Sequence, residues 1–238
     1  MAKATYRIQK VDGRHYFHDG KKYVLIDTGY GRTGSIDGTI GKFKVGLEHE
    51  EMLHRFNPTP MPDGSLAGAM LCPQTGYSCL LKNGLVEIDD DARELPRHDW
   101  FIPYDERYML NGRPFKPVVA CNVDGIRKTM FFDTGMRMPV IDDESIISGK
   151  KKVGETRERI GWLYTSVMAP VYNATFEFPC GLKLDGRCEY DYSHSLMKDI
   201  FGDNDSKGFF GTEELFGKYD VFISAIKGRH GIAIINRK

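Results

Sequence analysis

The chain has 238 residues, of which 41% are hydrophobic and 28% are charged. This balance is typical of a soluble globular protein and excludes a disordered one, and no apolar run approaches the roughly 20 residues that span a bilayer. The 33 basic residues equal the 33 acidic ones, so the molecule has no net charge to attract nucleic acid or an anionic membrane. We therefore expect neither kind of partner.

The cysteines and histidines do not form a metal-binding pattern. The five cysteines are odd in number and show neither CxxC spacing nor a neighbouring histidine pair: Cys72, Cys79, Cys121, Cys180 and Cys188. They predict no zinc site and no dense disulfide framework. Bridges between Cys72 and Cys79, or between Cys180 and Cys188, remain open if the compartment is oxidising. The seven histidines are dispersed, which disfavours a metal hydrolase.

The N-terminal segment, residues 1–6, lacks the apolar core of a secretory signal peptide. We therefore expect a cytoplasmic protein, or a secreted or periplasmic one from which a signal peptide has been removed. The neutral net charge does not choose between these compartments.

Short apolar runs rich in β-branched and aromatic residues, separated by glycine and proline, predict a chain made mainly of strands. Turn dipeptides such as Asp19-Gly20 and Asp124-Gly125 separate several of these runs, as hairpins require. The expected strands are 6–10, 23–27, 43–47, 85–88, 117–123, 129–133, 166–169, 174–178, 221–226 and 231–236. The expected helices are few and short: 48–56, 193–201 and 212–216.

The two halves of the chain share a motif. In each half a hairpin leads into an apolar strand that ends in Asp-Thr-Gly, at residues 27–29 and again at 133–135. Farther along, Leu66-Ala67-Gly68 and Phe209-Phe210-Gly211 each give two apolar residues followed by glycine, ahead of a terminal hairpin. An internal repeat of this kind predicts two related structural units. The boundary is expected in residues 89–111, an acidic stretch with two prolines.

Two Asp-Thr-Gly motifs in one chain, each closing an apolar strand, resemble the aspartic peptidases of the pepsin and retropepsin type. The resemblance covers most of the chain as architecture and is specific at the two motifs. It implies an all-β, bilobal aspartic-protease β-barrel fold with few short helices. The lobes would be residues 1–100 and 101–238, with Asp27 and Asp133 as the catalytic pair at their seam.

The chemistry explains why two carboxyl groups are required. Hydrolysis of an amide without a metal or a covalent intermediate needs a base to activate water and an acid to protonate the amide. Two carboxyl groups about 3 Å apart cannot both ionise, so one keeps its proton while the other stays basic, as in aspartic proteases. Asp27 and Asp133 would titrate jointly as this pair. No cofactor and no metal are needed.

The resemblance also implies roles for the residues that follow each aspartate, and we count these residues as part of the substrate site. Gly29 and Gly135 would allow the tight turn that brings each carboxylate to the seam, which a Cβ atom would hinder. Thr28 and Thr134 would bond the opposite loop, because a threonine hydroxyl can donate and accept at once. Ordinary turn threonines are the alternative.

Tyr30 and Met136 depart from the family pattern, which usually has Ser, Thr or Ala directly after Asp-Thr-Gly. Their side chains could crowd the carboxylates or line the substrate site. They therefore raise a second hypothesis, a peptide-binding protein that has the aspartic-protease scaffold but weak or no turnover.

A flap over the substrate is expected from the second half of the chain. Asp27 and Gly68 are 41 positions apart, against 78 for Asp133 and Gly211, so the first lobe has little room for such a hairpin. The glycine-flanked aromatic stretch 160–167 would supply it, with Trp162 and Tyr164 as substrate contacts. A role for both aromatics in the core of a sheet is the alternative.

The expected partner is a peptide or protein substrate in extended conformation, and the expected activity is that of an endopeptidase. Residues 29–34 match the GxGxxG pattern of dinucleotide-binding folds, but a β-branched and glycine-rich run follows where that fold needs a helix. Because one chain carries both aspartates, we expect a monomer. In the alternative, only the second half forms a full lobe and a homodimer pairs two copies of Asp133.

Overall fold

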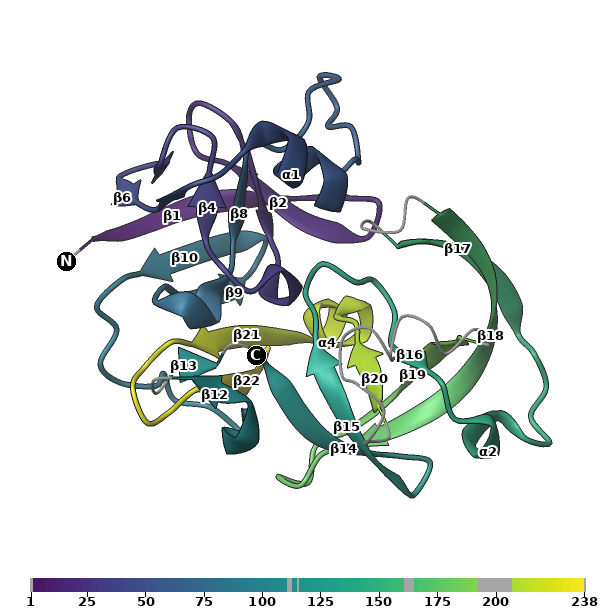
Figure 1. Ribbon diagram of the computed structural model, residues 1–238. Helices are drawn as coiled ribbons and strands as arrows, with labels where there is room; N and C mark the ends of the chain where they lie inside the picture. The colour runs from purple at the N-terminus through teal and green to yellow at the C-terminus, as the bar shows by residue number, and fades with distance from the viewer. Residues whose placement is uncertain (1, 111–112, 115, 161–164, 192–206, 238) are drawn as a thin grey trace.

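The computed structural model describes residues 2–110, 113–114, 116–160, 165–191 and 207–237 (Figure 1). Most of the regular structure in this part of the chain is β-strand. Its α-helices are short: α1 (Glu50–Phe56), α2 (Glu144–Ile147) and α4 (Glu213–Lys218). The all-β class with few short helices is therefore confirmed. The helix predicted at 193–201 lies outside the described residues.

The first half of the chain builds most of an 11-stranded sheet. Its strands there are β1 (Lys3–Val11), β2 (Arg14–His18), β3 (Tyr23–Ile26), β4 (Gly34–Ser35), β7 (Gly46–Leu47), β8 (Ala69–Leu71), β9 (Ser78–Lys82) and β10 (Leu85–Asp89). A small separate hairpin pairs β5 (Thr39–Ile40) with β6 (Phe43–Lys44). The one strand predicted at 43–47 is thus two short strands, which belong to different sheets.

The second half builds a seven-stranded sheet with the order β14-β15-β20-β16-β19-β18-β17. The strands are β14 (Val118–Val123), β15 (Ile126–Phe132), β16 (Val140–Ile141), β17 (Gly154–Ile160), β18 (Thr165–Glu177), β19 (Lys183–Tyr190) and β20 (Lys207–Phe210). The strands predicted at 166–169 and 174–178 are parts of the single long strand β18. A further pair joins β12 (Met109–Leu110) to β13 (Arg113–Pro114).

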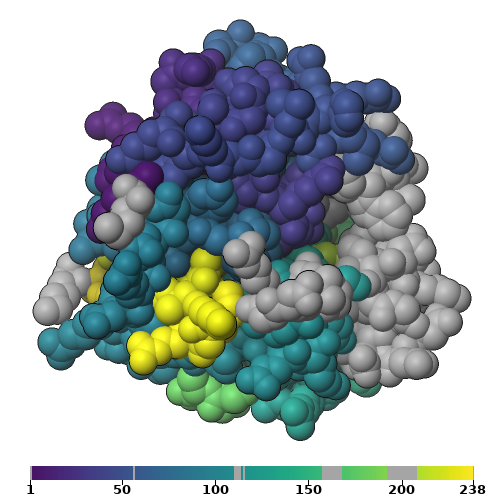
Figure 2. Space-filling model, turned by 60° about the vertical axis from the view of Figure 1, so that its left-hand side comes forward, coloured from purple at the N-terminus to yellow at the C-terminus, as the bar shows by residue number. Residues whose placement is uncertain are grey.

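The two halves share a sheet. The C-terminal hairpin of β21 (Tyr219–Ser224) and β22 (Gly231–Asn236) pairs with β9 of the first half, and β11 (Trp100–Pro103) pairs with β22. In Figure 2 the C-terminal residues, in yellow, accordingly lie between the purple and blue first half and the teal second half. The division into lobes at residue 100 stays a prediction.

The strand arrangement around each Asp-Thr-Gly motif is the same in both halves. The hairpin β2–β3 leads into the first motif and β3 pairs in parallel with β8; the hairpin β14–β15 leads into the second motif and β15 pairs in parallel with β20. The amide of Asp27 donates to the carbonyl of Leu71 at 2.9 Å, and the amide of Asp133 donates to Phe210 at 3.1 Å. Leu71 and Phe210 are therefore equivalent.

This equivalence corrects one prediction. The partner of Phe209-Phe210-Gly211 is Met70-Leu71-Cys72, four residues beyond the predicted Leu66-Ala67-Gly68. Glycine is needed only in the second half, because a Cβ atom on Gly211 would lie 2.4 Å from the backbone of Met138. The first half has room for the cysteine, so its motif does not end in glycine.

Candidate active site

Asp27 and Asp133 each leave the end of a buried strand and enter a tight turn. After β3, the chain forms the short 3₁₀ helix η1 (Thr28–Tyr30), and Oδ1 of Asp27 accepts hydrogen bonds from the amides of Gly29 at 2.8 Å and Tyr30 at 3.1 Å. After β15, Oδ1 of Asp133 accepts one from the amide of Gly135 at 2.8 Å. Both carboxyl groups are thereby fixed by their own loops.

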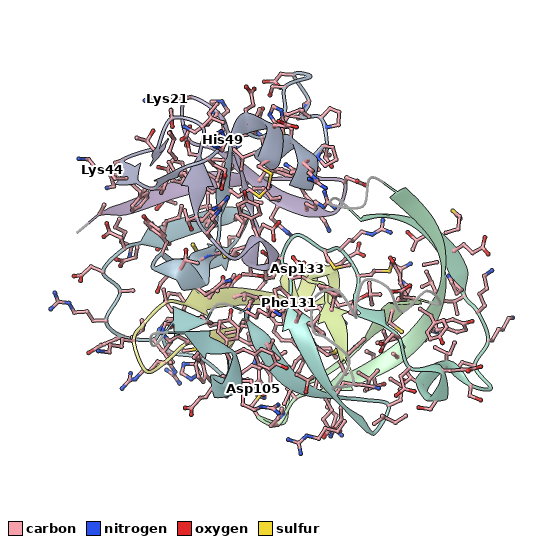
Figure 3. The ribbon with its side chains drawn as sticks, in the orientation of Figure 1. Lys21, Lys44, His49, Asp105, Phe131 and Asp133 are labelled. Carbon is pink, nitrogen blue, oxygen red and sulfur yellow. The ribbon has the colours of Figure 1, made fainter. Side chains whose placement is uncertain are left out.

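The two loops meet, and each glycine faces the opposite carboxyl group. A Cβ atom on Gly29 would lie 2.4 Å from Oδ2 of Asp133, and one on Gly135 would lie 2.8 Å from Cγ of Asp27. The two carboxyl groups are thus close enough for each to act on the pKa of the other, and both aspartates keep part of their surface exposed. Figure 3 labels Asp133 near the middle of the molecule, beside the first loop. The structure thus brings the two predicted aspartates together in one chain.

The pKa of both carboxyl groups is raised, and that of Asp133 is raised well above its ordinary value. Burial is the largest cause for each, because a low-dielectric environment disfavours the charged form. For Asp133 the charge of Asp27 comes next. For Asp27, the positive charge of Arg14 and the amides of its loop act in the opposite direction. The pair therefore holds its proton more tightly than free aspartate does, and more so at Asp133.

The two threonines lock the loops to each other. The hydroxyl of Thr28 accepts from the amide of Thr134 at 3.0 Å and donates to the carbonyl of Phe132 at 2.6 Å. In the other direction, the hydroxyl of Thr134 accepts from the amide of Thr28 at 3.0 Å and donates to the carbonyl of Ile26 at 2.8 Å. Both threonines are fully buried. Each hydroxyl donates and accepts across the seam, so these are not ordinary turn threonines. An all-β fold with two Asp-Thr-Gly loops clasped at one seam is what the resemblance to retropepsin-like proteases predicts.

Tyr30 packs against the core of the first half. Its ring contacts the apolar cluster that includes Tyr16, Leu53 and Met70. Burial, followed by the nearby carboxylate of Glu48, raises the pKa of Tyr30 to about 12. The bulk of the residue after the first motif is thus accommodated beside that core. A contact between Tyr30 and substrate stays a prediction.

Met136 has the corresponding place in the second half. It packs against the apolar cluster formed by Val118, Phe131, Val140 and Phe209. The two departures from the family pattern therefore have the same physical basis, since each side chain extends an apolar cluster of its own half. A contact between Met136 and substrate also stays a prediction.

The predicted flap corresponds to the hairpin of β17 and β18, whose last described pair is Ile160 with Thr165. Trp162 and Tyr164 lie outside the described residues. The hairpin is tied to the second loop region by Arg137, whose Nη2 donates to Oγ1 of Thr156 at 2.7 Å.

Sequence reasoning missed two side chains that support the first loop. The carbonyl of Thr28 accepts a hydrogen bond from Nε2 of Gln74 at 2.7 Å, and a longer one from Sγ of Cys72 at 3.6 Å. Both side chains are fully buried. Each lies more than 40 residues from Thr28, so no local pattern could have found them.

It also missed Arg14, at the start of β2, whose charge lowers the pKa of both aspartates. Arg14 precedes the hairpin turn at Asp19-Gly20 and Asp27 follows it, so this spacing could have indicated that the two residues are close. The strand that begins at Arg14 was not among the predicted ones.

The described residues contain no group of three or more potential metal ligands. All five cysteines are free thiols in the structure, and four of them are buried. Among the described helices, none has the length and apolar character needed to span a membrane.

Comparisons with known proteins give a partial likeness of fold. No protein-family model and no curated protein sequence matches the chain. A retropepsin-like aspartic protease from Rickettsia conorii is similar over 57% of this chain and 89% of its own, with 11% identity and a TM-score of 0.34. A foamy viral protease-reverse transcriptase in complex with double-stranded DNA is similar over 41% of this chain and 14% of its own, with 17% identity and a TM-score of 0.31. A foamy viral protease-reverse transcriptase in complex with an RNA/DNA hybrid is similar over 41% of this chain and 11% of its own, with 14% identity and a TM-score of 0.31.

Proposed function

We propose that this protein is an aspartic endopeptidase that hydrolyses peptide bonds with a water molecule activated between Asp27 and Asp133. The observation that carries the proposal is the meeting of the two carboxyl groups at one seam, where each faces the glycine of the opposite loop and the two loops clasp each other. Two acids with raised pKa values, one proton between them and partial solvent exposure are what general acid–base hydrolysis requires.

The hydrogen bonds of the two loops support a division of roles between the aspartates. Asp27 accepts two backbone N–H bonds and Asp133 accepts one, and hydrogen bonds to a carboxylate stabilise its charged form. Asp27 is therefore the base that takes a proton from water. Asp133, with the more strongly raised pKa, is the acid that donates its proton to the carbonyl oxygen of the scissile amide.

Collapse of the resulting tetrahedral intermediate then needs a proton on the leaving nitrogen. Asp27 donates the proton that it took from water to this nitrogen as the C–N bond breaks, and Asp133 takes back a proton from a hydroxyl group of the intermediate, which becomes the product carboxyl group, so the pair returns to its starting state with one shared proton. The pair supplies both the base and the acid from side chains of this chain, so the cycle closes without any further group.

The substrate in this proposal is a peptide in extended conformation across the seam, bound through backbone hydrogen bonds with side chains in pockets. One chain supplies both aspartates, which supports a monomer as the working unit. The cellular location stays a prediction.

Cleavage of a peptide library tests the proposal. The wild-type protein should cleave peptides between pH 4 and 7, and Asp27→Asn and Asp133→Asn should each abolish cleavage. Asp185→Asn, at an exposed position on β19, is the matched control and should keep full activity. Peptide binding without cleavage by the wild-type protein would instead support the peptide-binding hypothesis. Cleavage that survives Asp27→Asn would refute the assigned pair.

A further inference from the structure

Arg14 and Asp27 lie at the same end of one strand pair. In the antiparallel pair of β2 and β3, Tyr16 is opposite Leu25; Arg14 is the first residue of β2, and Asp27 directly follows the last residue of β3. The end of β2 that carries Arg14 is therefore the end at which the first catalytic loop begins.

The turn before Arg14 reaches the second loop region as well. A Cβ atom on Gly13 would lie 2.6 Å from Cδ of Arg137, which follows the second Asp-Thr-Gly motif by two residues. The hairpin of β1 and β2 thus spans the seam between the two halves. The positive charge of Arg14, on this hairpin, acts on both carboxyl groups and lowers the pKa of each.

A buried polar cluster holds the guanidinium group in place. Nη1 of Arg14 is 3.5 Å from Oδ1 of Asn57 and 3.4 Å from Oγ1 of Thr59, and the hydroxyl of Tyr16 donates to the same Asn57 oxygen at 2.7 Å. Tyr16 and Asn57 are fully buried, and Thr59 is nearly so. The contacts to Arg14 come from neutral groups, so they orient the side chain without neutralising its charge.

Within the described part of the chain, no carboxylate forms an ion pair with Arg14. The other cation near the first loop is different, because Arg32 is paired to Glu48 by two hydrogen bonds of 2.7 and 2.8 Å. A half-buried guanidinium that forms no ion pair within the described residues, beside a site that acts on a bound chain, has capacity for a further carboxylate. Its planar fork matches a carboxylate in two parallel hydrogen bonds.

We propose that Arg14 binds the carboxylate of an acidic residue in the substrate, close to the scissile bond, and so makes the enzyme selective for acidic peptides. The proposal rests on the peptidase function above and names its substrate class. Hydrogen bonds to a charged group contribute enough for a preference of roughly 10- to 100-fold over the neutral isostere.

The test uses pairs of peptides that differ only by glutamate or glutamine at one position, scanned over the positions on both sides of the cleavage site. The wild-type protein should show a kcat/KM that is roughly 10- to 100-fold higher for the glutamate peptide at one of these positions. Arg14→Gln should lose that ratio, whatever the change in its rate on the glutamine peptide, and Arg14→Lys should keep part of it. Arg7→Gln, an exposed position on the neighbouring β1, should keep the full ratio.

The outcomes separate the two proposals. Absence of cleavage of any peptide by the wild-type protein refutes the peptidase function itself. Cleavage with no preference for glutamate at any position refutes the role of Arg14 and leaves the peptidase function standing. That role is equally refuted if Arg14→Gln lowers kcat/KM by the same factor for both members of a pair. Because the wild-type preference is measured first, the proposal is tested even if Arg14→Gln fails to fold.

Discussion

Replacing Thr28 with valine tests the clasp between the loops. Valine has nearly the same shape but lacks the hydroxyl, so the amide of Thr134 and the carbonyl of Phe132 both lose this partner in a fully buried place. A buried polar group that loses its partner costs about 1–3 kcal/mol. For two such groups we expect the free energy of unfolding to fall by about 2–6 kcal/mol. This is a large share of the roughly 5–15 kcal/mol that stabilises a domain.

Urea unfolding at fixed pH measures this change, with Thr28→Ser as the matched control. Serine keeps the hydroxyl and loses one methyl group, so its loss should stay near 1 kcal/mol, as for removal of a buried methylene. Peptide cleavage should fall with valine and be retained with serine, because only valine releases the second loop. A valine variant as stable as the serine variant would refute the reasoning.

The corresponding change in the second loop adds a double-mutant cycle. Thr134→Val breaks the hydrogen bonds to the amide of Thr28 and the carbonyl of Ile26, a different set from those lost in Thr28→Val. If each hydroxyl holds both loops in register, the double variant should be less destabilised than the sum of the single variants, with a coupling of about 0.5–3 kcal/mol. Strict additivity would show that the two hydroxyl groups act independently.

Three further changes follow from the same geometry. The pKa of Asp133 is higher in the folded state than the unfolded value of about 3.9, so its contribution to stability is present below that pH and is lost as pH rises through the folded pKa. Asp133→Asn should therefore stabilise the fold at pH 8 but not at pH 3, as measured by urea unfolding. The gain should be about 1.4 kcal/mol for each pH unit that separates the folded pKa from the unfolded one. A gain that does not depend on pH would contradict this reasoning. Gly29→Ala places a methyl group against Asp133 and should lower kcat/KM by roughly 100-fold. Gly154→Ala, with no atom nearby, should change nothing, and equal losses would argue against the close approach. Gly217→Ala, on the exposed side of α4, should raise the free energy of unfolding by about 0.5–1 kcal/mol, and a loss in thermal unfolding would contradict it.

Several elements could be predicted from local sequence because their signals are local. The strands that precede Asp27 and Asp133 both end in an apolar run closed by a tight turn, and α1 was expected within two residues of its observed bounds. The strand Arg14–His18 was missed, because its buried centre is short and lies between a basic residue and a histidine. Without that strand, the place of Arg14 at the same end of the strand pair as the first aspartate could not be seen.

The error over Gly68 has a different origin. Sequence comparison matched the glycines of the two halves, whereas the parallel pairing of β3 with β8 makes Cys72 the counterpart of Gly211. A repeat in which one copy has lost its glycine cannot be aligned from residue types alone. Only the backbone contact of Gly211 with Met138 shows why the second half keeps this residue.

The sequence by itself determined the all-β class, the duplicated Asp-Thr-Gly loops and the identity of the two acids, since these depend on residue type and on spacing over a few positions. The tertiary structure decided that the two acids meet at one seam, that four threonine hydrogen bonds close this seam and that the charge of Arg14 acts on both acids. The clasp joins residues 104 to 108 positions apart. Contacts over such separations are set by how sheets pair and pack, and local patterns do not encode them.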